Sequence, residues 1–344
     1  MRLLCPAPPV NETRLLSEAG RAFPELALPD LSAPVMAQLT ADRGVDFATA
    51  LLYDRVRRCP RNGAFVRAVE ALEVSPAARP RCAGRLLVAP AAAYVEHPET
   101  GGDGALFCEI GAEFGLEPVV AAVGSGGTVT ENARVLVRRL RAETERSVIL
   151  LSFSKGGADA RVALRDAEAR RAVRVWVQVC GLVRGTPLAD RILDVPWLRL
   201  AVGANFAWRR WRLAALDELR AGPGSLLHGP PAAPPGVEVL NVVGFPLRSH
   251  VGHDTRVRHA RLSRWGPNDG AALLLDQVLE PGWIYPVWGA DHYFHMPGLS
   301  ALVYRLFTWL ALRDNPAALP QSSDSAPAEQ PAAIPPSGGI ASRP

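Results

Sequence analysis

Short runs of mostly apolar residues recur through the middle of the chain. They are RLLVA at 85–89, PVVAAV at 118–123, SVILLS at 147–152, VRVWVQV at 173–179, VEVLNVV at 237–243 and WIYPVW at 283–288. Runs of this length without regular apolar–polar alternation are typical of strands covered on both faces. Pro286 has no N–H to donate to a ladder, so the last run is predicted to lie at an edge of the sheet.

Between these runs, apolar residues recur at helical spacing in segments 103–114, 131–144 and 156–170. In the last two segments, basic residues gather toward the ends, where the helix dipole favours them. Repeated strand–helix–strand order predicts an α/β fold with a mostly parallel sheet, flanking helices and right-handed crossovers.

The same patterns divide the chain into regions. Residues 1–84 contain helical patterns and no comparable strand run, which predicts a helical N-terminal extension packed on a sheet domain at 85–314. Residues 315–344 are rich in Pro, Ala and Ser and have no aromatic residue. This composition buries too little apolar surface to offset the entropy of ordering, so we expect a disordered tail.

An insertion at about 190–235 separates the fourth and fifth predicted strands. Its tryptophans and aliphatic residues fall at helical spacing with arginines between them. We expect either a cap or lid that offers an apolar wall to a substrate, or a helical pair packed as ordinary core. A membrane-surface role is a third, less favoured interpretation, suggested by WRRW at 208–211.

The run at 147–152 ends in an abrupt change of composition, SFSKGG at 152–157, and then turns into helix-forming residues. A sharp strand-to-helix bend would put Ser154 at its apex, with small residues needed on either side at Ser152 and Gly156. The pattern resembles the G-x-S-x-G bend of the α/β-hydrolase family, with Ser152 in place of the first glycine. The resemblance covers roughly residues 86–294 and implies an α/β-hydrolase fold, with Ser154 as a nucleophile.

Members of that family carry a carboxylate and then a histidine downstream of the serine. The matching positions are Asp269, on the loop WGPNDG, and His292, directly after the last predicted strand. The resemblance implies that His292 takes the proton of Ser154 and that Asp269 orients the imidazole. Asp254 is the alternative acid, and His295 is the main rival to His292. The other histidines are interpreted as surface or loop residues: His97, His228, His250, His253 and His259.

The resemblance also implies an oxyanion hole made of two backbone N–H groups, one of them from Lys155, the residue after the nucleophile. The second is expected from the loop after the first strand, at Ala91 or Ala92, because Pro90 has no N–H. Lys155 is the only lysine among 38 basic residues. We consider two positions for its ammonium group: near the pocket mouth, where it would favour anionic substrates, or simply in solvent.

Composition narrows the function classes. The formal net charge is +4, yet no basic run alternates with aromatic residues, which argues against nucleic-acid binding. GSGGT at 124–128 lacks the full spacing and the lysine of a phosphate-binding loop. Five widely spaced cysteines indicate neither a disulfide framework nor a zinc site. No apolar segment is long enough for a signal peptide or a spanning helix, so we expect a cytoplasmic protein.

These observations favour a serine hydrolase that cleaves a small-molecule or lipid-like carboxylic ester, esterase-like or lipase-like, with no metal ion and no organic cofactor. The same three residues would serve an acyltransferase or a thioesterase. A catalytically inactive hydrolase-fold scaffold is the alternative from a different class.

Overall fold

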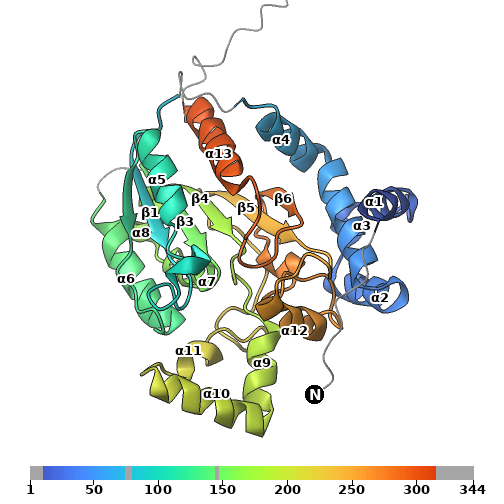
Figure 1. The fold of residues 1–344 in the computed structure, drawn as a ribbon. Helices are drawn as coiled ribbons and strands as arrows, with labels where there is room; N and C mark the ends of the chain where they lie inside the picture. Colours follow the sequence, from blue (N-terminus) through green and yellow to red (C-terminus); the bar gives the residue numbers. More distant parts are fainter. Residues whose placement is uncertain (1–10, 74–79, 144–146, 315–344) are drawn as a thin grey trace, which may run out of the picture.

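The computed structural model describes residues 11–73, 80–143 and 147–314, and its centre is a six-stranded sheet (Figure 1). The strands are β1 (Arg85–Ala89), β2 (Glu117–Val120), β3 (Val148–Phe153), β4 (Val173–Val179), β5 (Glu238–Phe245) and β6 (Trp283–Trp288). Their spatial order is β2-β1-β3-β4-β5-β6, and all neighbouring pairs are parallel. The predicted α/β class is confirmed, and β6 with its Pro286 lies at an edge.

One strand prediction needs correction. The run at 118–123 was expected to be covered on both faces, but β2 is the other edge strand and most of its residues are exposed. The strand also ends at Val120, and Val120 itself is 40% exposed. An edge strand has a neighbour on one side only, so apolar content alone did not reveal its position.

Helices cover both faces of the sheet. On one face, α5 (Ala105–Glu113) and α13 (Leu299–Asp314) pack against alternate strand residues such as Val88 and Leu151. The opposite face is covered by α6 (Val129–Arg141), α7 (Lys155–Ala163) and α8 (Ala167–Ala172). Side chains of a strand point alternately to its two faces, which gives each strand one set of contacts per layer.

The segment 156–170, predicted as one helix, is two. Helix α7 ends at Ala163, and Asp166 caps α8 by accepting a hydrogen bond from the Ala169 N–H. Aspartate stabilises a helix start by accepting from a free N–H group of the first turn. The helix therefore breaks here because the Asp166 side chain, and not a backbone carbonyl, accepts the hydrogen bond of the Ala169 N–H.

The N-terminal helices are α1 (Glu12–Arg21), α2 (Ala33–Arg43), α3 (Val45–Arg58) and α4 (Pro60–Glu70). Apolar side chains of α2 and α3 form a cluster with Val243 and Phe245 of β5 and Ile284 of β6. This layer therefore lies against the β5–β6 end of the sheet (Figure 1). The predicted tail at 315–344 lies outside the described residues.

The insertion between β4 and β5 forms α9 (Pro187–Asp194), α10 (Pro196–Trp208) and α11 (Ala214–Asp217). Figure 1 shows α10 at the periphery, with α9 and α11 between it and the sheet. Helix α12 (His253–Leu262) and three short 3₁₀ helices complete the elements: Leu28–Asp30, Pro98–Thr100 and Leu274–Gln277. In the described ranges, no helix is both long and apolar enough to cross a membrane.

Candidate active site

Ser154 lies at the bend between β3 and α7, at the carboxyl edge of the sheet. Its backbone angles are φ 50° and ψ −117°, a conformation that L-residues rarely adopt. Its N–H donates to the Val179 carbonyl at 3.2 Å, and its own carbonyl accepts from Leu182 at 2.8 Å. Neighbouring backbone on both sides thus holds the strained residue in place.

Two glycines make this bend possible. A Cβ on Gly156 would lie 2.1 Å from the Ala89 carbonyl oxygen, and one on Gly157 would lie 2.8 Å from the Gly181 Cα. Neither position can carry a side chain without moving backbone. Helix α7 therefore starts in close contact with β1, which is why Gly156, predicted to be small, cannot be larger.

Ser152, which occupies the position of the first glycine of the pattern, has a specific partner. Its Oγ accepts a hydrogen bond from the buried Trp176 Nε1 on β4, at 2.9 Å. An indole N–H buried without an acceptor would be costly. Serine at this position therefore provides the hydrogen-bond acceptor for a core tryptophan. The sequence pattern did not connect these two residues.

Ser154, His292 and Asp269 come together although 138 and 23 positions separate them along the chain. His292 Nε2 lies 2.8 Å from Ser154 Oγ, and His292 Nδ1 lies 2.7 Å from Asp269 Oδ2. The His292 N–H also donates to the Asp269 carbonyl at 3.0 Å. The Cys180 thiol donates to the His292 carbonyl at 3.2 Å, which fixes the loop after β6.

Asp269 is completely buried, and four donors surround its carboxylate. Oδ1 accepts from the N–H groups of Ala271 and Ala272 at 2.8 and 2.9 Å, and Oδ2 accepts from Gln277 Nε2 at 2.9 Å as well as from His292. Burial alone would raise the pKa of Asp269. The charge and hydrogen bond of His292, with the two N–H groups, outweigh burial and lower the pKa below its usual range.

An ionised carboxylate can only accept hydrogen bonds, so the proton of a neutral His292 belongs on Nδ1. Nε2 then carries the lone pair that faces Ser154. Gln277 is a supporting residue that the sequence analysis missed. Its only sequence signal is a polar residue, eight positions after Asp269, that follows the apolar run AALLL and Asp276.

The alternative residues lie elsewhere. Asp254, the alternative acid, is exposed in the first turn of α12. Asp291, the carboxylate next to His292 in the sequence, accepts from Thr255 Oγ1 and the Gly252 N–H. His295 stacks on Tyr293, with ring centroids 5.7 Å apart, instead of contacting Ser154. His259, expected at the surface, is buried on α12, and this burial lowers its pKa to about 4.

The two expected oxyanion donors differ in availability. Lys155 is the first residue of α7, where a backbone N–H has no partner within the helix. The Ala91 N–H donates to the Gly102 carbonyl at 2.8 Å, so Ala91 is not free to bind a substrate. This corrects half of the prediction and leaves Ala92, for whose N–H no acceptor is found in the described ranges.

Comparison with known proteins adds to this geometry. No protein-family model and no curated protein sequence matches the chain. Among solved structures, it is similar to the crystal structure of the metagenomic carboxyl esterase MGS0156, with a TM-score of 0.52 and 18% identity over 71% of this chain and 81% of that one. The chain has the α/β-hydrolase fold. A second similar structure is the mature Bacillus licheniformis lipase BlEst2, with a TM-score of 0.45 and 18% identity over 70% of this chain and 92% of that one.

Within this hydrolase fold, Lys155 occupies neither of its expected positions. Its side chain is buried, and Nζ binds both carboxylate oxygens of Asp159 one helical turn later, at 2.8 and 3.0 Å. Burial raises the pKa of Asp159 to about 6 against the opposing effects of Lys155 and Asn132. The ion pair is therefore formed at neutral pH, inside the protein and not at a pocket mouth.

Asn132 connects this ion pair to the GSGGT loop. Its Nδ2 donates to Asp159 at 2.9 Å and to the Gly124 carbonyl at 3.2 Å, and its Oδ1 accepts from the Gly124 N–H at 3.0 Å. The loop then runs to Thr128, which caps α6 in a reciprocal pair with Glu131. The side chain of Asn132 thus serves to hold the loop next to α7.

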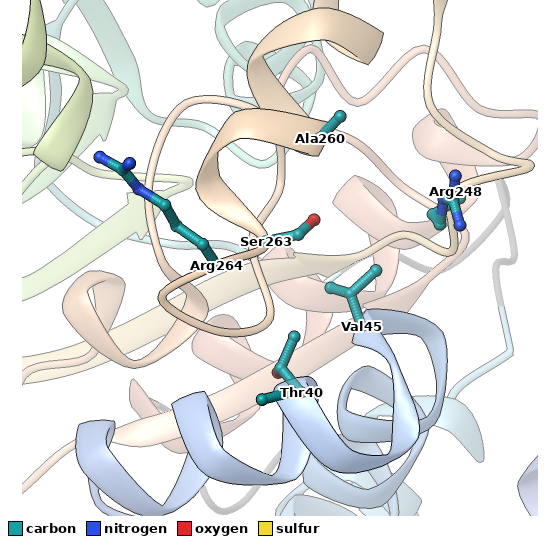
Figure 2. Close-up of a pocket in the computed structure, with 7 residues that line it drawn as sticks. Thr40, Val45, Arg248, Ala260, Ser263 and Arg264 are labelled. Atoms are coloured by element: carbon teal, nitrogen blue, oxygen red, sulfur yellow. The ribbon is translucent and has the colours of Figure 1, made fainter. Parts of the chain in front are cut away.

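A pocket of about 510 Å³ opens elsewhere in the hydrolase fold, between α2, α3 and α12. In Figure 2, Arg248 and Arg264 lie at its two ends, with Thr40, Val45 and Ser263 between them. Ser154, His292 and Asp269 do not line it. Within the described residues, no group of three or more His, Cys, Asp or Glu side chains could hold a metal ion.

Proposed function

We propose that the protein is a serine hydrolase that cleaves a carboxylic ester through an acyl-enzyme intermediate. The observation that carries this proposal is the continuous chain of contacts from Ser154 Oγ through His292 to Asp269. Nucleophile, base and orienting carboxylate are each within hydrogen-bond distance, which is the arrangement that activates a serine hydroxyl. The fold and the strained bend at Ser154 are further support.

In the first step, Ser154 Oγ attacks the ester carbonyl while its proton moves to His292 Nε2. The resulting imidazolium is stabilised by the Asp269 carboxylate, which stays ionised. Collapse of the tetrahedral intermediate breaks the bond to the alcohol oxygen, and His292 returns the proton to that oxygen. The acyl group remains on Ser154.

In the second step, water replaces the alcohol. His292 Nε2 takes a proton from the water, whose oxygen attacks the acyl carbonyl, and the proton then passes to Ser154 Oγ as the acid is released. The negative oxygen formed in each step would be held by the N–H of Lys155, with Ala92 as the proposed second donor. The ion pair of Lys155 with Asp159 would fix the first turn of α7 and so the direction of that N–H.

The test is labelling by a fluorophosphonate, combined with hydrolysis of p-nitrophenyl butyrate. We expect the wild-type protein to be labelled and active. Ser154→Ala should be unlabelled, with a turnover rate lower by roughly 10⁶-fold. Ser152→Ala is the matched control, because it removes a hydroxyl two residues away and should keep labelling.

Failure of the folded wild-type protein to be labelled would contradict the proposal and favour an inactive scaffold. Labelling without hydrolysis, together with acyl transfer to an added alcohol or thiol, would instead identify an acyltransferase on the same three residues.

A further inference from the structure

The outer side of α10 is an unusually apolar surface. Trp197 is 65% exposed, Leu200 76% and Trp208 79%, and no residue of this 13-residue helix is buried. These are three of the six large apolar side chains that are strongly exposed in the described part of the chain. Clustered exposure of this kind marks a surface that contacts another apolar phase.

The three side chains share one face. Positions 197, 200 and 208, with the exposed Ala201 and Ala204 between them, recur at helical spacing and form a stripe along α10. The partly buried Leu198, Val202 and Phe206 fall on the opposite side. The helix is therefore apolar on both sides, and only one side faces the protein.

The inner side of α10 is already packed against the rest of the protein, so the exposure of its outer face does not result from a missing contact on the inner side. Trp211, just after α10, packs on the GSGGT loop: a Cβ on Gly126 would lie 2.2 Å from its indole Cγ. Trp211 Nε1 also donates to Glu96 at 3.2 Å, and its ring contacts Phe206 edge to face. Helix α9 supports α10 from the same inner side.

The segment that contains α10 carries charges of one sign. Residues 195–216 contain four arginines and no acidic residue. Arg212 pairs with Glu131, and Arg209 lies over the rings of Trp208 and Trp211. Arg199 and Arg210 are exposed and have no carboxylate partner in the described ranges.

We propose that the outer face of α10 binds the surface of an anionic phospholipid membrane. The helix would lie in the plane of the membrane, with Trp197 and Trp208 at the level of the headgroups and Leu200 between them. Arg209 and Arg210, which follow Trp208 at the end of the helix, would contact lipid phosphates. A second copy of the chain fits this face less well, because it would bring unpaired arginines against one another.

The test is flotation of the full chain with vesicles of phosphatidylcholine alone or mixed 7:3 with phosphatidylglycerol, in 0.1 M NaCl. We expect binding to the mixed vesicles and little to the neutral ones. Trp197→Ser with Trp208→Ser should weaken binding at least about tenfold. Arg209→Gln with Arg210→Gln should weaken it by roughly 25-fold, about fivefold for each charge.

The matched controls are Val120→Ser, an exposed apolar residue of β2, and Arg134→Gln with Arg138→Gln on α6, which should bind as the wild type does. Each variant should keep its circular dichroism spectrum and unfolding midpoint. Ser154→Ala should float normally, so failure of the proposed hydrolase activity and failure of membrane binding are separate results.

Absence of binding to the mixed vesicles would overturn the proposal, and so would equal binding to both vesicle types. A dimer in sedimentation that the tryptophan double variant abolishes would identify α10 as a contact between copies and would also overturn it.

Discussion

The candidate active site and the outer face of α10 have opposite kinds of environment. Around His292 and Asp269, the polar side chains make specific hydrogen bonds, and the Asp269 carboxylate is completely buried with four donors. On α10, large apolar side chains are exposed and the helix has no buried residue. In the first region, polar groups are held by hydrogen bonds within the protein. In the second region, apolar side chains are left in contact with water.

The difference separates positions where substitution changes chemistry or folding from positions where it changes binding only. Polar groups in the interior depend on fixed partners, because each loses its hydration on folding. Exposed side chains have no such dependence. Substitutions in the two regions should therefore differ in both size and kind.

The largest expected effect, after loss of Ser154 itself, is at Asp269. Asp269→Asn puts an amide next to His292 Nδ1 and favours the tautomer with its proton on Nε2, so Nε2 cannot accept the Ser154 proton. We expect turnover of p-nitrophenyl butyrate to fall by about 10⁴-fold. The exposed Asp254→Asn is the matched control, and an equal loss there would contradict the assignment.

Next comes the buried ion pair. Lys155→Met leaves the Asp159 carboxyl buried without its cation, which should lower the free energy of unfolding by roughly 3–5 kcal/mol at pH 8. The pKa of Asp159, already raised to about 6, should rise further. Because the folded state then binds the proton more tightly than the unfolded state, stability should fall as pH rises.

Urea unfolding of Lys155→Met at pH 5 and pH 8 measures this effect, with a smaller loss expected at pH 5. Lys155→Met combined with Asp159→Leu should be more stable than Lys155→Met at pH 8. If Lys155→Met were as stable as the wild type at pH 8, the ion pair of Lys155 with Asp159 would not contribute to the free energy of unfolding.

A smaller effect is expected at Ser152. Ser152→Gly restores the glycine of the family pattern but removes the acceptor of the Trp176 N–H, which should cost about 1–3 kcal/mol in unfolding free energy. In a Trp176→Phe background the same substitution should cost less, since no indole N–H remains. Equal losses in both backgrounds would show that the hydrogen bond is not the cause.

The smallest effect is expected on α10. Trp197→Ser should change the free energy of unfolding by no more than about 0.5 kcal/mol, because the side chain is 65% exposed. Trp176→Ala, which empties a buried position, should cost about 3–5 kcal/mol. Thermal or urea unfolding of the two variants compares them directly. A large loss for Trp197→Ser would remove the distinction between the two regions.

The sequence predicted most of the sheet because burial leaves a local signal. The runs at 85–89, 173–179 and 283–288 coincide with β1, β4 and β6, and Pro286 indicated the edge. The bend at Ser154 was also local, since Gly156 must be small wherever β3 meets α7. The sequence pattern did not predict the edge position of β2 or the helix break after Ala163. The first depends on how many strands lie beside β2, and the second on the capping side chain of Asp166.

By itself, then, the sequence determined the α/β class, the positions of most strands and the candidates Ser154, Asp269 and His292, since periodicity, small residues and chain order are properties of short segments. Only the tertiary structure decided that Asp269 and not Asp254 contacts His292, that Ala91 is already bonded, and that Lys155 points inward to Asp159. The physical reason is that these contacts join residues far apart in the chain, or depend on the direction in which a side chain points. The hydrogen bond between Ser152 and Trp176 is defined by the packing of two separate strands, and the direction of the Lys155 side chain is fixed by the helix that carries it.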